Sequence, residues 1–118
     1  MYTVELGIRT ESLLNKREHW RTTAARKKRH RAYTTAMLQT IPKPPLPCVC
    51  VLTRRSVGTL DKHDNLPSSQ KNLVDAIALW LGIDDADERI QWRYEQEKTK
   101  RGVFGVRIEF FPAVSIKG

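Results

Sequence analysis

The chain has 118 residues, a formal net charge of +8 and a hydrophobic fraction of 40%. This length suits one domain, residues 1–118, with its own core, and is too short for two comfortable ones. The sequence has no apolar run of about 18 residues that could span a membrane, and its first residues, MYTVELGIRTE, lack the apolar stretch of a signal peptide. These features predict a soluble, intracellular protein.

The charge is divided unevenly along the chain. Residues 1–60 hold 12 Lys and Arg against three acids, whereas residues 61–118 hold nine against ten. A first half this basic suits a polyanionic partner, of which nucleic acid is the commonest. A solvated basic surface that only keeps the protein soluble is the alternative.

The chain begins with a predicted strand and a long basic helix. The stretch YTVELGI alternates apolar and polar side chains, which predicts a strand over residues 2–9. Residues 17–39 contain neither Pro nor Gly, which favours a continuous helix. Eight Lys and Arg lie between Lys16 and Arg31, so we expect a broad basic face. The narrow apolar seam is predicted to contain Trp20, Ala24, Ala32 and Ala36.

A proline-rich connector leads to a second predicted strand. Residues 41–47, IPKPPLP, exclude helix and form a stiff, extended crossing inside the domain. The following CVCVLTR alternates like a strand and puts Cys48 and Cys50 on one face. Same-face neighbours on one strand have the wrong geometry for a disulfide, and the sequence lacks a second ligand pair for zinc. Both cysteines are expected to be reduced core residues.

A second helix follows. Asp64 or Asn65 can cap it, Pro67 suits its first turn, and Gly82 ends it. Its buried face is expected to contain Leu66, Leu73, Val74, Ile77 and Leu81.

Two further strands complete the predicted fold. Residues 89–96 and 103–111 have strand patterns, and a turn at residues 99–102 is expected to return the second strand antiparallel to the first. The sequence therefore predicts an α+β domain of order β-α-β-α-β-β, with two main helices packed on a mixed sheet.

Acidic residues gather on both sides of the second helix. Asp61 and Asp64 precede it, and Asp84 and Asp85 follow it. Helix caps, turns and a charged loop are one explanation. A calcium loop is excluded, because DKHDNLPSSQKN has Leu66 and Asn72 where such a loop needs Gly and Glu.

A shared divalent metal is the other explanation for these acids. Clustered carboxylates repel one another and are hard oxygen ligands that suit Mg²⁺. A helix of roughly 15 residues is about 22 Å long, so the two groups can meet only if the loops at its ends fold back.

Lys71 lies within the second helix, one turn before Asp75. The pair is either a weak surface ion pair or a means of placing an ammonium beside a phosphate, where it stabilises negative charge in a transition state.

These segments resemble the RusA family of Holliday junction resolvases. The family pattern is an Asp-x-Asp-Asn segment, a helix with a Lys and then an Asp one turn later, and an Asp-Asp pair before a strand. This sequence has LDKHDN, then KNLVD, then LGIDD, and its NKREHW, DERIQWRYEQ and GVRIEF are also similar to a phage branch of the family. Two residues separate Asp61 from Asp64 where the family pattern has one, so either Asp61 or His63 completes the first segment. Compared with shorter members of the family, this sequence also has PSS inserted before Lys71.

The resemblance implies a RusA-like homodimer that resolves four-way DNA junctions by symmetric, Mg²⁺-dependent phosphodiester hydrolysis, with Mn²⁺ as a possible substitute. It implies a phage or prophage protein acting in the bacterial cytoplasm. The catalytic residues carried over are Asp61, Asp64, Lys71 and Asp85, and the metal ligands are Asp61, Asp64, Asp84 and Asp85. The expected DNA-binding residues are Arg17, His19, Arg21, Arg26, Lys27, Lys28, Arg29 and Arg31.

Two other functions remain open from the sequence. A non-catalytic protein that binds branched DNA or other nucleic acid could keep the same scaffold without the site. A basic structural protein whose acids only cap helices is the third possibility.

Overall fold

The computed structural model describes residues 2–8, 20–58 and 65–113, and the side chains of residues 20–23, 65 and 68 are not described. In chain order the elements are β1 (Tyr2–Leu6), α1 (Trp20–Leu38), β2 (Cys48–Ser56), α2 (Asn65–Ser69), α3 (Lys71–Leu81), β3 (Ile90–Lys98) and β4 (Gly105–Pro112). The protein is thus a small α+β fold with two main helices and a four-stranded mixed sheet, as the sequence predicts.

The strands are arranged in the order β1-β4-β2-β3. β4 pairs antiparallel with both β1 and β2, whereas β3 pairs parallel with β2, in the register that joins Cys50 to Trp92. The predicted hairpin between β3 and β4 is therefore wrong in its pairing, because β2 lies between them. A parallel β2–β3 pair needs a crossover, which α2 and α3 supply.

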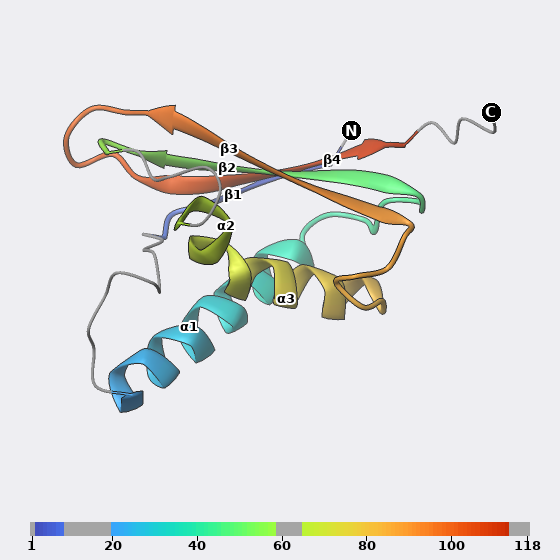
Figure 1. Cartoon of the computed structure of the whole chain (residues 1–118), viewed down its shortest axis with the longest axis horizontal. Coiled ribbons are helices and arrows are strands. Elements are labelled where there is room, and N and C mark those ends of the chain that lie inside the picture. The colour runs from blue at the N-terminus through green and yellow to red at the C-terminus, as the bar shows by residue number, and fades with distance from the viewer. Residues whose placement is uncertain (1, 9–19, 59–64, 114–118) are drawn as a thin grey trace.

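The two main helices lie on one face of the sheet, below it in Figure 1. α3 is strongly apolar and packs against α1 and the covered face of the sheet, and six of its eleven residues are buried. It ends where the sequence predicts, because Gly82 adopts a left-handed φ of 75° and its N–H donates to the Leu79 carbonyl at 3.1 Å.

The second predicted helix is divided in two. Gln70, with φ −100° and ψ 0°, separates the single turn of α2 from α3. Its N–H donates to the Pro67 carbonyl at 3.1 Å, which closes α2 before α3 starts. The predicted buried face is otherwise confirmed, with Leu66, Leu73, Val74 and Ile77 buried and Leu81 partly buried.

The core lies between this helical layer and the covered face of the sheet. Alternate residues of each strand point into it, as the period of a strand requires. β2 contributes Cys48, Cys50 and Leu52, and β4 contributes Val106, Ile108 and Phe110. Cys48 and Cys50 are free, buried thiols, as predicted.

α1 is helical where the sequence predicts, but the predicted apolar seam is wrong. Ala24, Ala32 and Ala36 are exposed, while Thr34 and Leu38 are fully buried one turn apart. Alanine has too little apolar surface to decide which face of a helix is buried, and the large Leu38 side chain contributes far more burial energy. The side chain of Trp20 lies outside the described residues.

The opposite face of the sheet carries a network of exposed ion pairs. Glu5 on β1 and Glu97 on β3 lie at its sides, and Arg107 and Arg55 lie between them. The Arg107 Nε lies 3.1 Å from Glu5 Oε1, and the Arg55 Nε lies 3.1 Å from Glu97 Oε1.

Among the helices described, none is long and apolar enough to cross a bilayer.

Candidate functional site

Lys71 lies between two of the carboxylates that the sequence singles out. It is the first residue of α3, and its Nζ lies 3.1 Å from Asp75 Oδ1 and 3.0 Å from Asp85 Oδ2. Asp75 is one helical turn further on, while Asp85 follows the far end of the helix. The loop after α3 therefore folds back along the helix, which is one of the two conditions for a shared acidic site.

Two features hold this loop in place. The left-handed Gly82 reverses the chain, and the next N–H, that of Ile83, donates to the Ala78 carbonyl at 3.0 Å. The indole Nε1 of Trp92, near the start of β3, donates to the backbone carbonyl of Asp85 at 2.8 Å. Trp92 thus fixes the backbone of Asp85 against the sheet, while its carboxylate remains near solvent, with 38% of the side chain exposed.

Lys71 and Asp85 each stabilise the charged form of the other. Hydrogen bonds to Asp85 and Asp75 raise the pKa of Lys71, and the hydrogen bond from Lys71 lowers the pKa of Asp85. Lys71 and Asp85 are consequently both charged at neutral pH. Burial raises the pKa of nearby Tyr94, so its hydroxyl stays protonated.

Arg31 connects the basic helix α1 to the same group. Its Nη2 lies 3.2 Å from Asp75 Oδ2, and 54% of its side chain is exposed. The sequence predicts that Arg31 binds DNA, and the structure pairs this half-exposed side chain with Asp75. Arg31, Asp75, Lys71 and Asp85 therefore form one continuous chain of ion pairs, which we call the Lys71 network.

The other described acids of the loop stabilise its own backbone. Asp84 Oδ1 accepts a hydrogen bond from the Ala86 N–H at 3.1 Å. Asp87 accepts from the Arg89 N–H and from its guanidinium, each at 2.8 Å, and these bonds from Arg89 lower the pKa of Asp87 to about 2. The charged-loop explanation therefore accounts for Asp87 and for one oxygen of Asp84, but not for the Asp85 side chain.

Part of the predicted site lies outside the described residues. This holds for Asp61, His63 and Asp64, and for the DNA-binding candidates Arg17 and His19. Arg21 belongs to α1, but its side chain is not described. Lys28 and Arg29 are exposed on α1, and Arg26 and Lys27 are partly exposed, so these four predicted DNA-binding residues can all reach a partner.

The described residues include donor atoms of the type that a divalent metal binds, but too few of them are close together to hold an ion. Asp84 and Asp85 offer carboxylate oxygens of the kind Mg²⁺ prefers, and Asp85 already attracts the Lys71 ammonium. Within residues 2–8, 20–58 and 65–113, no group of three His, Cys, Asp or Glu is placed to hold a metal ion. A metal site at Asp85 would therefore need further ligands from Asp61 and Asp64.

Sequence reasoning missed three residues around this region. Trp92 was predicted on a strand, but its bond to the Asp85 carbonyl depends on the folded loop. Arg54 is buried with 9% exposure and donates to the Gly58 carbonyl at 2.8 Å. The strand alternation from Cys48 could have placed Arg54 on the inner face. Gln70 is fully buried, and neither atom of its amide has a hydrogen-bond partner in the described part of the chain.

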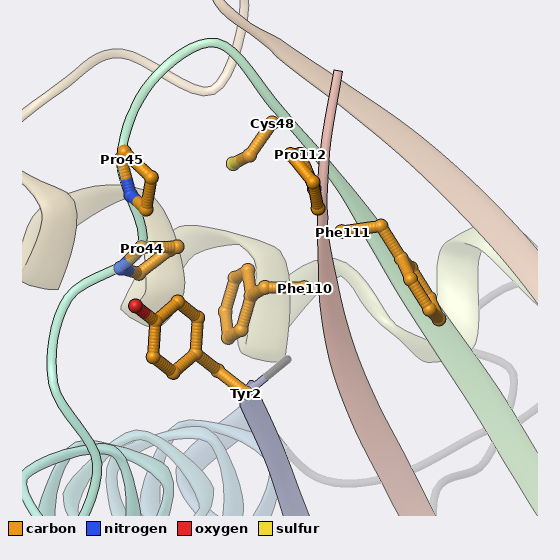
Figure 2. Close-up of a pocket in the computed structure, with 7 residues that line it drawn as sticks. All are labelled: Tyr2, Pro44, Pro45, Cys48, Phe110, Phe111 and Pro112. Atoms are coloured by element: carbon orange, nitrogen blue, oxygen red, sulfur yellow. The ribbon is translucent and has the colours of Figure 1, made fainter. Parts of the chain in front are cut away.

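A separate apolar pocket lies where the proline connector meets the sheet. Figure 2 shows it between Pro44 and Pro45 on one side and Tyr2 and Phe110 on the other. Its volume is about 170 Å³, and no charged side chain lines it. Burial raises the pKa of Cys48, the thiol in its lining, which disfavours the reactive thiolate. This pocket therefore offers a mainly apolar surface, and its thiol is not activated as a nucleophile.

No protein-family model, curated protein or solved structure matches this chain. The resemblance to the RusA family consequently rests on the sequence motifs around Asp64, Lys71 and Asp85.

Proposed function

We propose that this protein is a Mg²⁺-dependent endodeoxyribonuclease that cuts branched DNA, with a four-way junction as the substrate. The observation that supports this proposal best is the contact between Lys71 and Asp85, 3.0 Å apart. These residues belong to two separate motifs of the RusA pattern, at opposite ends of α3. Their convergence is what a catalytic site built from both motifs requires.

Each group has a distinct role in the proposed reaction. Asp85 and Asp84 would bind Mg²⁺ together with Asp61 and Asp64. The ion would supply an activated water and polarise the scissile phosphate. Lys71, with 55% of its side chain exposed, would stabilise negative charge on the phosphate oxygens. Trp92 positions Asp85 through its backbone carbonyl.

The remaining parts of the proposal concern binding and assembly. The exposed cations of α1 would contact phosphates without reading bases, which gives affinity with a steep salt dependence. A homodimer would present two equivalent sites to the symmetric strands of a junction. The free thiols of Cys48 and Cys50 are compatible with a reducing cytoplasm.

A non-catalytic DNA-binding protein is the second candidate function. The Lys71 network is also compatible with this function, because Lys71 and Arg31 pair with Asp75 and Asp85 and balance their negative charge. On this alternative the acids only hold α3, α1 and the following loop together, and the basic surface alone binds DNA.

The test is cleavage of a labelled four-way junction in Mg²⁺ and in Mn²⁺. Asp85→Asn and Asp64→Asn are expected to lower the rate at least about 100-fold, since loss of one charge-stabilising group commonly costs that much. Asp87→Asn is the matched control, because Asp87 is paired with Arg89 in the same loop. Junctions left intact by the wild type in both metals, while binding persists, would support the non-catalytic alternative.

Metal binding can be measured separately from cleavage. Saturating Mg²⁺ is expected to raise the unfolding temperature of the wild type, because a ligand that binds only the folded state stabilises it. Asp85→Asn should lose this shift and Asp87→Asn should keep it. An equal shift in both variants would place the metal elsewhere.

A further inference from the structure

The loop between β3 and β4 exposes two adjacent large apolar side chains. Val103 is 42% exposed and Phe104 is 41% exposed. The loop projects beyond the end of the sheet, at the far left of Figure 1, away from the helical layer. We call residues 98–104 the KTKRGVF loop.

The backbone of the KTKRGVF loop is fixed by hydrogen bonds. The Val103 N–H donates to the Lys100 carbonyl at 3.0 Å, which closes a β-turn. Gly102 occupies the third position of that turn with a φ of 87°, a conformation that favours glycine. The Thr99 N–H donates to the carbonyl of Ser56 at 3.0 Å, so the loop is anchored to the end of β2. The side chains at the tip are therefore presented in a defined geometry.

The same loop is strongly basic. Lys98, Lys100 and Arg101 are exposed, and residues 98–104 contain no acid. The nearest acid along the chain is Glu97, whose carboxylate lies 3.1 Å from Arg55 and 3.5 Å from Arg107. Its negative charge is thus already compensated on the open face of the sheet, and the loop offers net positive charge to a partner.

We propose that the KTKRGVF loop is a contact for branched DNA, in which Lys98, Lys100 and Arg101 bind phosphates and Phe104, with Val103, packs against an exposed base pair. Proteins that bend or open nucleic acids use single apolar side chains next to cations in this way. Two side chains are a small surface for a membrane or a stable protein partner, since both need much larger apolar areas. This inference rests on the proposed DNA substrate and adds a surface that distinguishes branched from linear DNA.

The position of the loop fits one DNA arm that also reaches the Lys71 network. Trp92, which holds Asp85, lies six residues before Lys98 on β3. A strand rises about 3.3 Å per residue, so these residues are about 20 Å apart along β3. That span is shorter than one turn of duplex DNA, about 34 Å. A base pair exposed at a branch point and a phosphate further along the arm can therefore be contacted together.

The test measures binding without cleavage. A fluorescently labelled four-way junction and a linear duplex of the same composition are titrated with protein in EDTA, and binding is followed by anisotropy. Phe104→Ala is expected to weaken junction binding about fivefold or more while changing duplex binding less, because stacking on a base is lost. The double variant Lys100→Ala/Arg101→Ala should weaken both complexes and reduce the slope of log affinity against log salt by about two.

Two matched variants control for these changes. Leu79→Ala removes an apolar side chain that is 80% exposed on α3, and Lys43→Ala removes an exposed cation in the proline connector, which leads to the opposite end of β2. Both are expected to bind the junction like the wild type. In addition, the fluorescence of 2-aminopurine at the branch point should change when the wild type binds and change less with Phe104→Ala, because this fluorescence depends on what stacks on the base.

The outcomes separate this inference from the proposed nuclease activity. If Phe104→Ala binds the junction as tightly as Leu79→Ala, the loop proposal is wrong, whether or not the protein cuts DNA. If the wild type binds through the loop but never cleaves, only the nuclease proposal fails. A Phe104→Ala variant with a lower urea midpoint and unchanged 2-aminopurine signal would make Phe104 a packing residue. Phe104-dependent binding to phosphatidylserine vesicles, with unchanged DNA affinity, would identify a membrane contact instead.

Discussion

The two main helices of this protein, α1 and α3, contribute in opposite ways. α3 has eleven residues and buries six of them, whereas the nineteen-residue α1 fully buries only Thr34 and Leu38 among its described side chains. α1 contains no acid and carries its Lys and Arg in its first two thirds. In Figure 1 its N-terminal end points away from the sheet. α3 therefore contributes more buried surface to the core than α1, whereas α1 contributes a cluster of positive charge.

The C-terminal half of α1 is attached to the rest of the fold through both apolar and polar contacts. The C-terminal half of α1 is held by Leu38, by the Arg31–Asp75 ion pair, and by the Tyr33 hydroxyl, which accepts a hydrogen bond from the Gly7 N–H at 3.3 Å. This division explains how a helix with so little apolar surface can be part of a stable domain. It also separates stability from binding, so substitutions in the two helices should change different measured quantities.

The largest expected effect is on the apolar face of α3. Ile77 is fully buried in the core, so Ile77→Ala should lower the free energy of unfolding by about 3 kcal/mol, through lost burial and the cavity that remains. Leu79→Ala on the same helix should change it by less than about 0.5 kcal/mol, because that side chain is 80% exposed. Urea unfolding measures both. Similar losses in the two variants would contradict the packing of α3.

The charge on α1 should matter for binding and not for folding. Lys28→Gln/Arg29→Gln is expected to weaken DNA binding about tenfold at moderate salt and to reduce the salt slope by about two. The unfolding midpoint should stay within about 0.5 kcal/mol of the wild type, since both side chains are exposed. Lys43→Gln, which removes one exposed cation outside α1, is the control and should change the salt slope by at most about one. Unchanged DNA affinity in the double variant would leave α1 as a solvated surface.

The ion pair between the helices is expected to contribute little energy. The Arg31 and Asp75 side chains are 54% and 29% exposed, so solvent screens their attraction. A double-mutant cycle with Arg31→Gln and Asp75→Asn should give a coupling of less than about 1 kcal/mol that falls as salt is added. A coupling of several kcal/mol, independent of salt, would mean that α1 is attached by charge instead of by Leu38.

The smallest effect concerns pH and the loop after α3. Asp87 has a folded pKa of about 2, lowered from 3.8 by its bonds from Arg89. The unfolded chain therefore binds this proton first as pH falls, and the stabilisation from Asp87 is present above about pH 4 and is lost between pH 4 and pH 2. Asp87→Asn should show a shallower loss of stability in this range when urea unfolding is measured as a function of pH. α1 contributes nothing to this titration, because it contains no carboxylate.

Local patterns predicted most elements but not their pairing. The alternation of β1, β2, β3 and β4 and the end of α3 at Gly82 are local properties, and all were predicted correctly. The short turn between β3 and β4 suggested a hairpin, yet β2 lies between these strands. Chain proximity favours a neighbour in sequence, but the α3 crossover brings β3 to the free side of β2. The choice between β4 and β2 as the partner of β3 depends on tertiary contacts, which local sequence patterns do not contain.

The candidate site shows the same limit at the level of single residues. The sequence identified Lys71, Asp75, Asp84 and Asp85, because their spacing is local and resembles a family pattern. It could not show that Asp85 returns to Lys71, since this depends on Gly82 and on the bond from Trp92. It also could not show the ion pair between Arg31 and Asp75, which exists only once α1 docks on α3.

Most strands and both main helices, the excess of positive charge in the first half and the acids around the second helix could be read from the sequence alone. These follow from side-chain chemistry and from periodicities of two or 3.6 residues, which act over a few neighbours. The strand order, the buried face of α1, the division between α2 and α3 and the Lys71 network became apparent only in the folded protein. These features depend on contacts between residues that are far apart in the chain. Such contacts form only when the helices and the sheet pack together.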